Sequence, residues 1–266
     1  MPELPEVETT IRRLEPELVH RRIMALQVNW PRHVVDLESL QVHLPGHRVT
    51  GLGRRGKYII IYLDPADQTV LIHLRMSGRL EVLSVNAPED KHAHTTLVLD
   101  DGRALRFSDT RKFGRLILTR DPETVLGKLG VEPLSESFTV DWLSEGVARR
   151  TRQIKSLLLD QSFVAGLGNI YTDEALFRAR LHPLRRSNTL SGEESAGLLD
   201  AIRSVLEEGI LRCGASIDWV YRGGDFQNYF NVYRRTGEPC LVCGTPIERI
   251  VVGQRGTHIC PNCQVA

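Results

Sequence analysis

The chain opens with apolar residues at helical spacing. Val7, Ile11 and Leu14 recur every three to four positions, and acidic residues fill the start of this segment. Such spacing puts apolar side chains on one face of a helix, and carboxylates near a helix N-terminus interact favourably with the helix dipole. The pattern predicts a helix that starts near Pro5 and ends before Pro16, because proline interrupts the hydrogen bonds of a helix.

The segment from Ile23 to about Leu118 has the pattern of β-strands. Short runs rich in β-branched residues alternate with Gly, Pro and Asp. The runs are 49–62, 70–74, 80–85, 95–99 and 105–107. Many short strands at regular spacing predict a β-sandwich.

The pattern changes to helical periods after residue 122, and short strands around paired cysteines return from residue 231 onward. A chain of 266 residues exceeds the usual size of one domain. We therefore predict an N-terminal β-sandwich over 1–131, a linker over 132–139, a helical domain over 140–230 and a cysteine-rich module over 231–266. The helices should run from about Val140 to Arg212 and end near Cys213 and Gly214.

Composition is ordinary for a soluble globular protein and argues against a membrane protein. Hydrophobic residues make up 41% and charged residues 25%, and no apolar run is long enough to span a bilayer. The first residues are acidic and contain proline, the reverse of a secretory signal. We expect a cytoplasmic protein.

Charge is unevenly distributed, although the formal net charge is only +1. Residues 149–186 hold eight basic and three acidic side chains, a net +5. A locally basic segment favours docking of a polyanion on one face, while a solvated helix face is the alternative.

Four of the five cysteines form two Cys-x2-Cys pairs, Cys240 with Cys243 and Cys260 with Cys263, separated by sixteen residues. This spacing is typical of a structural zinc site, in which four thiolates leave the metal no open position. Disulfides are the alternative, and a reducing cytosol disfavours them. The remaining Cys213 is expected to pack as a small apolar side chain.

Several motifs resemble one known family. They are PELPEVET at 2–9, GRRGKY at 53–58, HLRMSG at 73–78, DTRKFG at 109–114, GLGNIYTDEALF at 166–177 and the terminal cysteine pairs. Together they resemble the bacterial formamidopyrimidine-DNA glycosylase family along essentially the whole chain. The resemblance implies an α+β fold, with an N-terminal two-layer β-sandwich with flanking helices and a C-terminal helix-two-turn-helix domain that carries a zinc β-hairpin.

The same resemblance implies an activity. Family members remove 8-oxoguanine and ring-opened purines from damaged double-stranded DNA and then cleave the strand at the resulting gap. We expect this chain to act on such DNA as a monomer with one structural zinc ion. Residues 215–229 match the family's lesion-reading loop poorly.

The resemblance assigns four catalytic residues. Once Met1 is removed, the amine of Pro2 is the nucleophile, and a terminal amine is nucleophilic near neutral pH because its reference pKa is about 8. Glu3 is the general acid, Lys57 the proton donor in β-elimination, and Arg255 serves the second elimination.

Three of these assignments have a structural alternative. Pro2 by composition alone suits a disordered terminus, Glu3 a carboxylate at a helix dipole, and Lys57 an exposed strand position. Glu6 is expected to have a supporting role, accepting backbone N–H groups that fix the N-terminal segment.

DNA contacts are assigned in the same way. Family positions that contact DNA correspond to His73, His92, Arg150 and Asn169, and the turn 166–169 offers backbone N–H groups to a phosphate. Met76, Arg111 and Phe113 match the three residues that fill the space of an extruded nucleotide. Alternatively, Met76 and Phe113 are core residues and His92 pairs with His94 at a metal.

Three rival functions differ from this interpretation. A sister glycosylase acts on oxidised pyrimidines with the same nucleophile, and the start of the chain and the Met76, Arg111 and Phe113 set favour the purine enzyme. A non-catalytic zinc-ribbon DNA-binding protein has no use for a terminal Pro-Glu pair together with Lys57. A metal-dependent nuclease would need a metal with an open position, which four thiolates do not leave.

Overall fold

The computed structural model describes residues 1–216 and 223–265. Residues 217–222, within the poorly matching segment 215–229, lie outside the described part. The chain divides into two compact units. Of the described residues, unit 1 contains 1–2, 6–128, 216 and 223, and unit 2 contains 3–5, 129–215 and 224–265.

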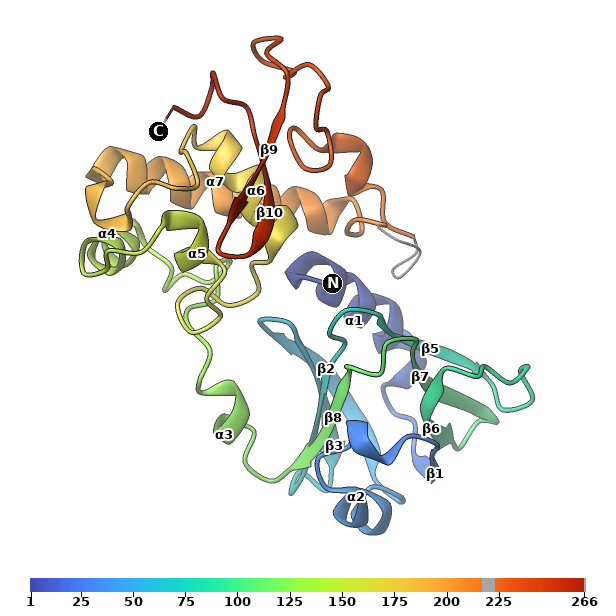
Figure 1. The fold of residues 1–266 in the computed structure, drawn as a ribbon. Coiled ribbons are helices and arrows are strands. Elements are labelled where there is room, and N and C mark those ends of the chain that lie inside the picture. The colour runs from blue at the N-terminus through green and yellow to red at the C-terminus, as the bar shows by residue number, and fades with distance from the viewer. Residues whose placement is uncertain (217–222, 266) are drawn as a thin grey trace. The chain divides into compact units, whose positions relative to one another are not determined.

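Unit 1 contains two four-stranded antiparallel sheets (Figure 1). The first has the order β1-β6-β7-β5 and the second the order β2-β3-β4-β8. The strands are β1 (Ile23–Val28), β2 (Arg48–Arg55), β3 (Tyr58–Asp64), β4 (Thr69–His73), β5 (Gly78–Ser84), β6 (Ala93–Leu99), β7 (Arg103–Asp109) and β8 (Arg115–Thr119). The predicted β-sandwich is confirmed.

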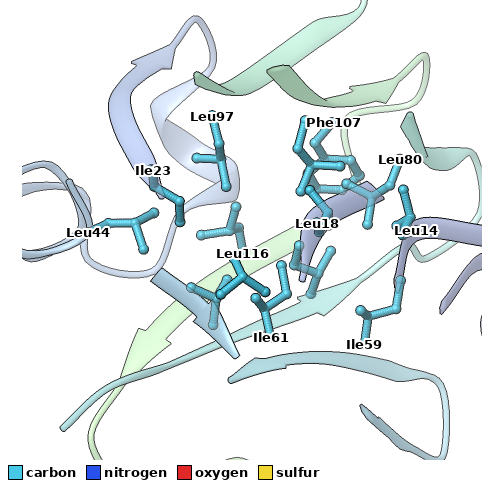
Figure 2. Close-up of a cluster of buried hydrophobic side chains, with 14 of the residues drawn as sticks. Leu14, Leu18, Ile23, Leu44, Ile59, Ile61, Leu80, Leu97, Phe107 and Leu116 are labelled. Carbon is cyan, nitrogen blue, oxygen red and sulfur yellow. The ribbon is translucent and has the colours of Figure 1, made fainter. Parts of the chain in front are cut away.

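One apolar core joins the two sheets. Leu97 and Phe107 from the first sheet point toward Ile61 and Leu116 from the second (Figure 2). Each of these side chains is at most 3% exposed. Burial alternates along β8 and over residues 95–99 of β6, as expected for two facing layers that share one interior.

The first helix, α1 (Leu4–Leu18), is longer than predicted, and its predicted end before Pro16 is wrong. Pro16 lies in the last turn, where only one intrahelical hydrogen bond is lost. Leu14 and Leu18, one turn apart, are both buried in the core of unit 1. Their packing holds the last turn despite the proline.

The predicted run 49–62 is also wrong as a single strand. It is a hairpin of β2 and β3, in which Arg55 pairs with Tyr58. Gly56 has a φ of +55°, a left-handed conformation that glycine adopts without strain. Short helices that the pattern missed are η1 (Pro31–His33), α2 (Leu37–His43) and α3 (Glu123–Leu126).

Unit 2 is helical, as predicted for residues 140–212. Its helices are α4 (Val140–Ala148), α5 (Ile154–Leu158), α6 (Asn169–Arg178), η2 (Ser187–Thr189), α7 (Gly192–Leu211) and η3 (Phe226–Tyr229). Ser191 and Glu194 form a reciprocal capping box that starts α7. Cys213 at the end of α7 is exposed and has a φ of +57°, so its predicted packing in the interior is wrong.

The chain ends in an antiparallel hairpin of β9 (Glu248–Val252) and β10 (Arg255–Ile259). The two Cys-x2-Cys pairs flank this hairpin in sequence. Among residues 1–216 and 223–265, none of the helices has the length and apolar character needed to cross a membrane.

Candidate functional site

Glu3 is fixed at the N-terminus of α6. Its carboxylate accepts backbone N–H bonds from Gly168 at 2.7 Å, from Ile170 at 2.9 Å and from Tyr171 at 3.4 Å. The side chain is only 2% exposed. The positive end of a helix and three N–H donors together stabilise an anionic carboxylate there.

This arrangement corrects one prediction at Gly168. The turn 166–169 was expected to offer its N–H groups to a DNA phosphate, but the N–H of Gly168 binds Glu3 instead. A Cβ atom at Gly168 would lie 2.2 Å from Cδ of Glu3, so only glycine allows this approach. The glycine-rich turn therefore seats a carboxylate of the protein itself.

A buried ion pair, which sequence reasoning missed, joins the terminal hairpin of β9 and β10 to α6. Nζ of Lys155 donates to Oδ1 of Asp173 at 2.6 Å and to Oγ1 of Thr257 at 2.7 Å. The backbone N–H of His258 donates to Oδ2 of Asp173 at 3.0 Å. Burial lowers the pKa of Lys155, and the Asp173 carboxylate opposes that shift. Lys155 is fully buried, so it is no part of a basic surface.

Glu174, the neighbour of Asp173 on α6, has a similar structural role. Its carboxylate accepts N–H bonds from Asn231, Val232 and Tyr233 at 2.9–3.0 Å. The acidic pair in the motif 166–177 thus fixes β10 and the segment before the cysteines to one helix. Sequence reasoning did not predict this role for either acid.

Most of the basic segment 149–186 is neutralised within unit 2. Acidic residues outside or inside the segment pair with its arginines: Glu145 with Arg149, Asp160 with Arg152, Glu208 with Arg178 and Glu194 with Arg185. The net +5 of the segment therefore overstates the field that DNA would meet. Arg150 is exposed; its guanidinium donates to the Gly146 carbonyl and lies 4.9 Å from the Phe163 ring.

Arg255 is exposed at the first position of β10. The residue after it is held, since Nδ2 of Asn169 donates to the Gly256 carbonyl at 2.9 Å. The hairpin thus presents the Arg255 guanidinium from a backbone that is fixed to α6. Asn169 has this structural partner, and its contact with DNA stays a prediction.

The four cysteines of the terminal module meet as predicted. The Sγ atoms of Cys240, Cys243, Cys260 and Cys263 all lie within 4.8 Å of one another. The distances are 3.9 Å from Cys240 to Cys263 and 3.4 Å from Cys243 to Cys260, both longer than a disulfide bond of about 2 Å. Tetrahedral zinc with Zn–S bonds of about 2.3 Å needs sulfurs about 3.8 Å apart. The site fits one structural zinc ion.

Lys57 lies in the turn between β2 and β3 and is buried, 5% exposed, so the alternative of an exposed strand lysine is wrong. His73, at the end of β4, is also buried. Burial, together with the positive Arg75 and Lys57, lowers the pKa of His73 to about 3, and the neutral ring accepts the backbone N–H of Arg75 at 3.0 Å. This neutral histidine supports the turn that carries Met76.

Met76 and Phe113 lie on the two loops that follow β4 and β7. Phe113 is 48% exposed and Met76 is half-buried, so neither is a core residue. The guanidinium carbon of the exposed Arg111 lies 5.4 Å from the centre of the Phe113 ring. Unit 1 thus places the three residues predicted to fill the space of an extruded nucleotide on two loops that a hydrogen bond between Ser77 and Arg111 joins.

Two buried residues beneath these loops were missed by sequence reasoning. Oγ of Ser77 donates a short hydrogen bond to Oδ1 of Asp109, and the carboxylate also accepts the N–H of Gly114 at 2.7 Å. Asp109 precedes the predicted Arg111 by two positions, and Ser77 follows Met76. Their place inside the two motifs was the only available indication.

The other predicted residues lie as follows. Pro2 and Glu6 are buried, and Glu6 is in the first turn of α1. His92 is half-buried, and its carbonyl accepts the N–H of Asp109 at 2.9 Å. His94 is buried with Nε2 2.6 Å from the Asp109 carbonyl, so this nitrogen has a protein partner in place of a metal. The roles of Pro2, Glu6 and His92 stay predictions.

The buried side chain of His33 makes the stability of the protein depend on pH. Burial, with the nearby His94 and Arg115, lowers the pKa of His33 to about 4 from 6.5. Between these values the unfolded chain binds more protons, so the stability contributed by neutral His33 is complete above pH 6.5 and falls as the pH falls toward 4.

Replacing His33 by Gln should therefore remove about 1 kcal/mol per pH unit from the acid dependence of unfolding. Urea denaturation from pH 7.5 to pH 4.5 measures it. His43→Gln, at an exposed position of α2, is the control. Parallel pH profiles for native protein and His33→Gln would contradict the shift.

Comparisons with known proteins agree with this architecture. Residues 1–116 match the formamidopyrimidine-DNA glycosylase N-terminal domain, residues 129–219 the formamidopyrimidine-DNA glycosylase H2TH domain, and residues 237–265 a zinc finger found in FPG and IleRS. The formamidopyrimidine-DNA glycosylase of Herpetosiphon aurantiacus is 47% identical, over 99% of this chain and 100% of that protein. That of Streptococcus pneumoniae is 41% identical over 99% of each.

Solved structures show the same similarity. The Lactococcus lactis Fpg in complex with DNA that contains an abasic site has a TM-score of 0.94 at 38% identity, over 99% of this chain and 100% of that one. Its wild-type complex with DNA containing N7-benzyl-Fapy-dG has a TM-score of 0.95 at 39% identity, over the whole of both chains. By its sequence motifs, its three matched domains and these relatives, the chain belongs to the formamidopyrimidine-DNA glycosylase family.

Proposed function

We propose that this chain removes oxidised purines, 8-oxoguanine and formamidopyrimidines, from duplex DNA and then cleaves the strand at the abasic site. Similarity to glycosylases that were crystallised with abasic or Fapy-dG DNA supports the substrate class. The structural observation that carries the proposal is Glu3, buried next to Pro2 in the chain and held by three backbone N–H groups. We also propose that the protein acts as a monomer in the bacterial cytoplasm.

The proposed reaction starts at Pro2 after loss of Met1. The amine nitrogen forms a bond to C1′ of the extruded nucleotide, and the bond from C1′ to the damaged base breaks. The sugar ring then opens as the bond from C1′ to the ring oxygen breaks, and the proton released by the alkylated proline nitrogen passes through the Glu3 carboxylate to that oxygen. The product is an iminium ion between the proline nitrogen and C1′.

Strand cleavage follows from the charge of that iminium ion. The positive charge acidifies the proton on C2′, and its loss expels the 3′ phosphate by β-elimination. Lys57 serves as the proton donor of this step, and Arg255 assists a second elimination that expels the 5′ phosphate. Base removal and strand cleavage thus share one covalent intermediate, which hydrolysis releases from the protein.

A gel assay with three duplexes tests the function. A duplex with one 8-oxoguanine should be cut to leave a one-nucleoside gap with phosphates at both ends. A duplex with a thymine glycol, an oxidised pyrimidine, should be cut far more slowly, and an undamaged duplex should only be bound. Faster cutting of the thymine glycol duplex would favour the sister enzyme, and binding of all three without cutting would favour a non-catalytic protein.

We further propose that Arg111 reads the base opposite the lesion. An orphaned cytosine presents two adjacent acceptors, O2 and N3, which match the donor fork of a guanidinium, whereas adenine presents a donor beside its acceptor. Arg111 is exposed at the tip of its loop, where it can meet such a base.

Native protein should therefore remove 8-oxoguanine opposite cytosine about tenfold to a hundredfold faster than opposite adenine, because a bidentate base contact discriminates by about 1 to 3 kcal/mol. Arg111→Ala should lose most of this preference. The measurement is kcat/KM for removal of 8-oxoguanine opposite each base. A native protein without the preference, or a variant that keeps it fully, would show that Arg111 is not the reader.

A further inference from the structure

We propose that Ser77 and Asp109 form a positioning pair that sets the loop carrying Met76 against the loop carrying Arg111 and Phe113. The pair would act on discrimination of the opposing base through Arg111. This inference rests on the proposed function of Arg111. We define the two segments as the Met76 loop, residues 74–77, and the Arg111 loop, residues 110–114.

The Asp109 carboxylate holds both ends of the Arg111 loop. Oδ1 accepts the backbone N–H of Arg111 at 3.1 Å, and Oδ2 accepts that of Gly114 at 2.7 Å. Two N–H bonds to one buried carboxylate close the loop over a single side chain. Such charge-assisted bonds are shorter and stronger than neutral ones.

Ser77 connects this closed loop to the Met76 loop. Its hydroxyl donates to Oδ1 of Asp109, and its oxygen accepts the Arg111 N–H at 3.1 Å. Ser77 follows Met76 directly in the chain. Through one hydroxyl, the backbone beside the Met76 side chain is therefore bonded to the backbone of Arg111.

Asp109 itself is held on every side. It is 1% exposed and pairs with Gly78 in the ladder between β5 and β7. Its N–H donates to the His92 carbonyl at 2.9 Å, and its carbonyl lies 2.6 Å from Nε2 of His94. The carboxylate therefore has a fixed position in the first sheet, and its hydrogen bonds set the positions of both loops.

Packing leaves these loops little freedom to move apart or shift. A Cβ atom at Gly78 would lie 2.8 Å from the Phe107 ring, and one at Gly114 would lie 2.4 Å from it. Both glycines therefore pack closely against the ring of Phe107. The exposed Arg111 and Phe113 contact each other and take their direction from this buried base, because their side chains project into solvent.

The test uses Ser77→Ala, which removes only the hydroxyl. Ser77→Ala should reduce the preference for cytosine over adenine by about twofold to tenfold, the range expected for one lost buried hydrogen bond. In an Arg111→Ala background the same change should have no further effect on the preference, because the pair acts through Arg111. Thr119→Ala is the matched control, because its hydroxyl holds a turn beside Asp121 elsewhere in unit 1.

Hydrogen exchange without DNA provides a second measurement. Ser77→Ala should accelerate exchange in the peptide 109–115, whereas Thr119→Ala should not change it there. Unchanged exchange in Ser77→Ala, a fully kept preference, or an equal loss in the Arg111→Ala background would each overturn the proposal. If exchange accelerates but native protein shows no cutting of 8-oxoguanine DNA, the pair holds the loops as proposed and the proposed function is what fails.

Discussion

Borohydride should trap the native chain covalently on DNA that contains 8-oxoguanine, because an iminium ion between Pro2 and C1′ can be reduced to a stable amine. Pro2→Gly should reduce the trapped product at least about tenfold. Its primary amine lacks the proline ring that holds the nucleophilic nitrogen in place. A chain that retains Met1 should trap almost nothing, because its proline nitrogen is part of a peptide bond and has no nucleophilic lone pair.

The trapped complex is measured by denaturing gel electrophoresis with labelled DNA. Mass spectrometry of the amino terminus of each preparation establishes whether Met1 is present. Lys57→Met is an informative companion, because a protein without that ammonium still has the amine of Pro2 and should still be trapped. Equal trapping of native protein, Pro2→Gly and the Met1-retaining chain would rule out Pro2 as the nucleophile.

Loss of the zinc ion should weaken DNA binding, because the metal holds the hairpin and takes no direct part in the chemistry. A structural zinc site contributes about 10 to 16 kcal/mol to the folding of its module, and a two-stranded hairpin such as β9–β10 is marginal alone. Cys243→Ser should therefore release β10 and Arg255, with a Kd for abasic-site DNA at least about tenfold weaker.

Cys213→Ser is the matched control, because that thiol is exposed and is not part of the four-cysteine cluster. It should keep both its zinc content, measured by elemental analysis, and its DNA affinity, measured by gel shift. A Cys243→Ser protein that bound DNA normally and yet failed to cleave it would mean that the metal takes part in catalysis, against four-sulfur coordination.

The sequence alone predicted the elements whose cause is local. Short β-branched runs between Gly, Pro and Asp predicted the strands of unit 1, and helical periods predicted that helices dominate unit 2. The four-cysteine site was equally predictable, because the two Cys-x2-Cys turns and their spacing are themselves a near-complete description of the site. Short motifs were also enough to identify the family.

Features that depend on packing were not predictable from local pattern. Pro16 should end α1, but the burial of Leu14 and Leu18 in the core keeps its last turn helical. A basic sequence around Lys155 suggests a surface, whereas that ammonium is fully buried against Asp173. The sequence shows the sign and spacing of the charges, but the residues that pair with them lie far away in the chain.

The site shows the same division. Sequence resemblance identified Glu3 and Arg111 by position, but only the tertiary structure shows what holds them: N–H groups of α6 for Glu3, and the Ser77–Asp109 pair for Arg111. Residues 3 and 168 are 165 positions apart, and no periodicity connects them. A residue's chemistry is a property of its side chain, whereas its position and protonation are set by neighbours that folding brings together.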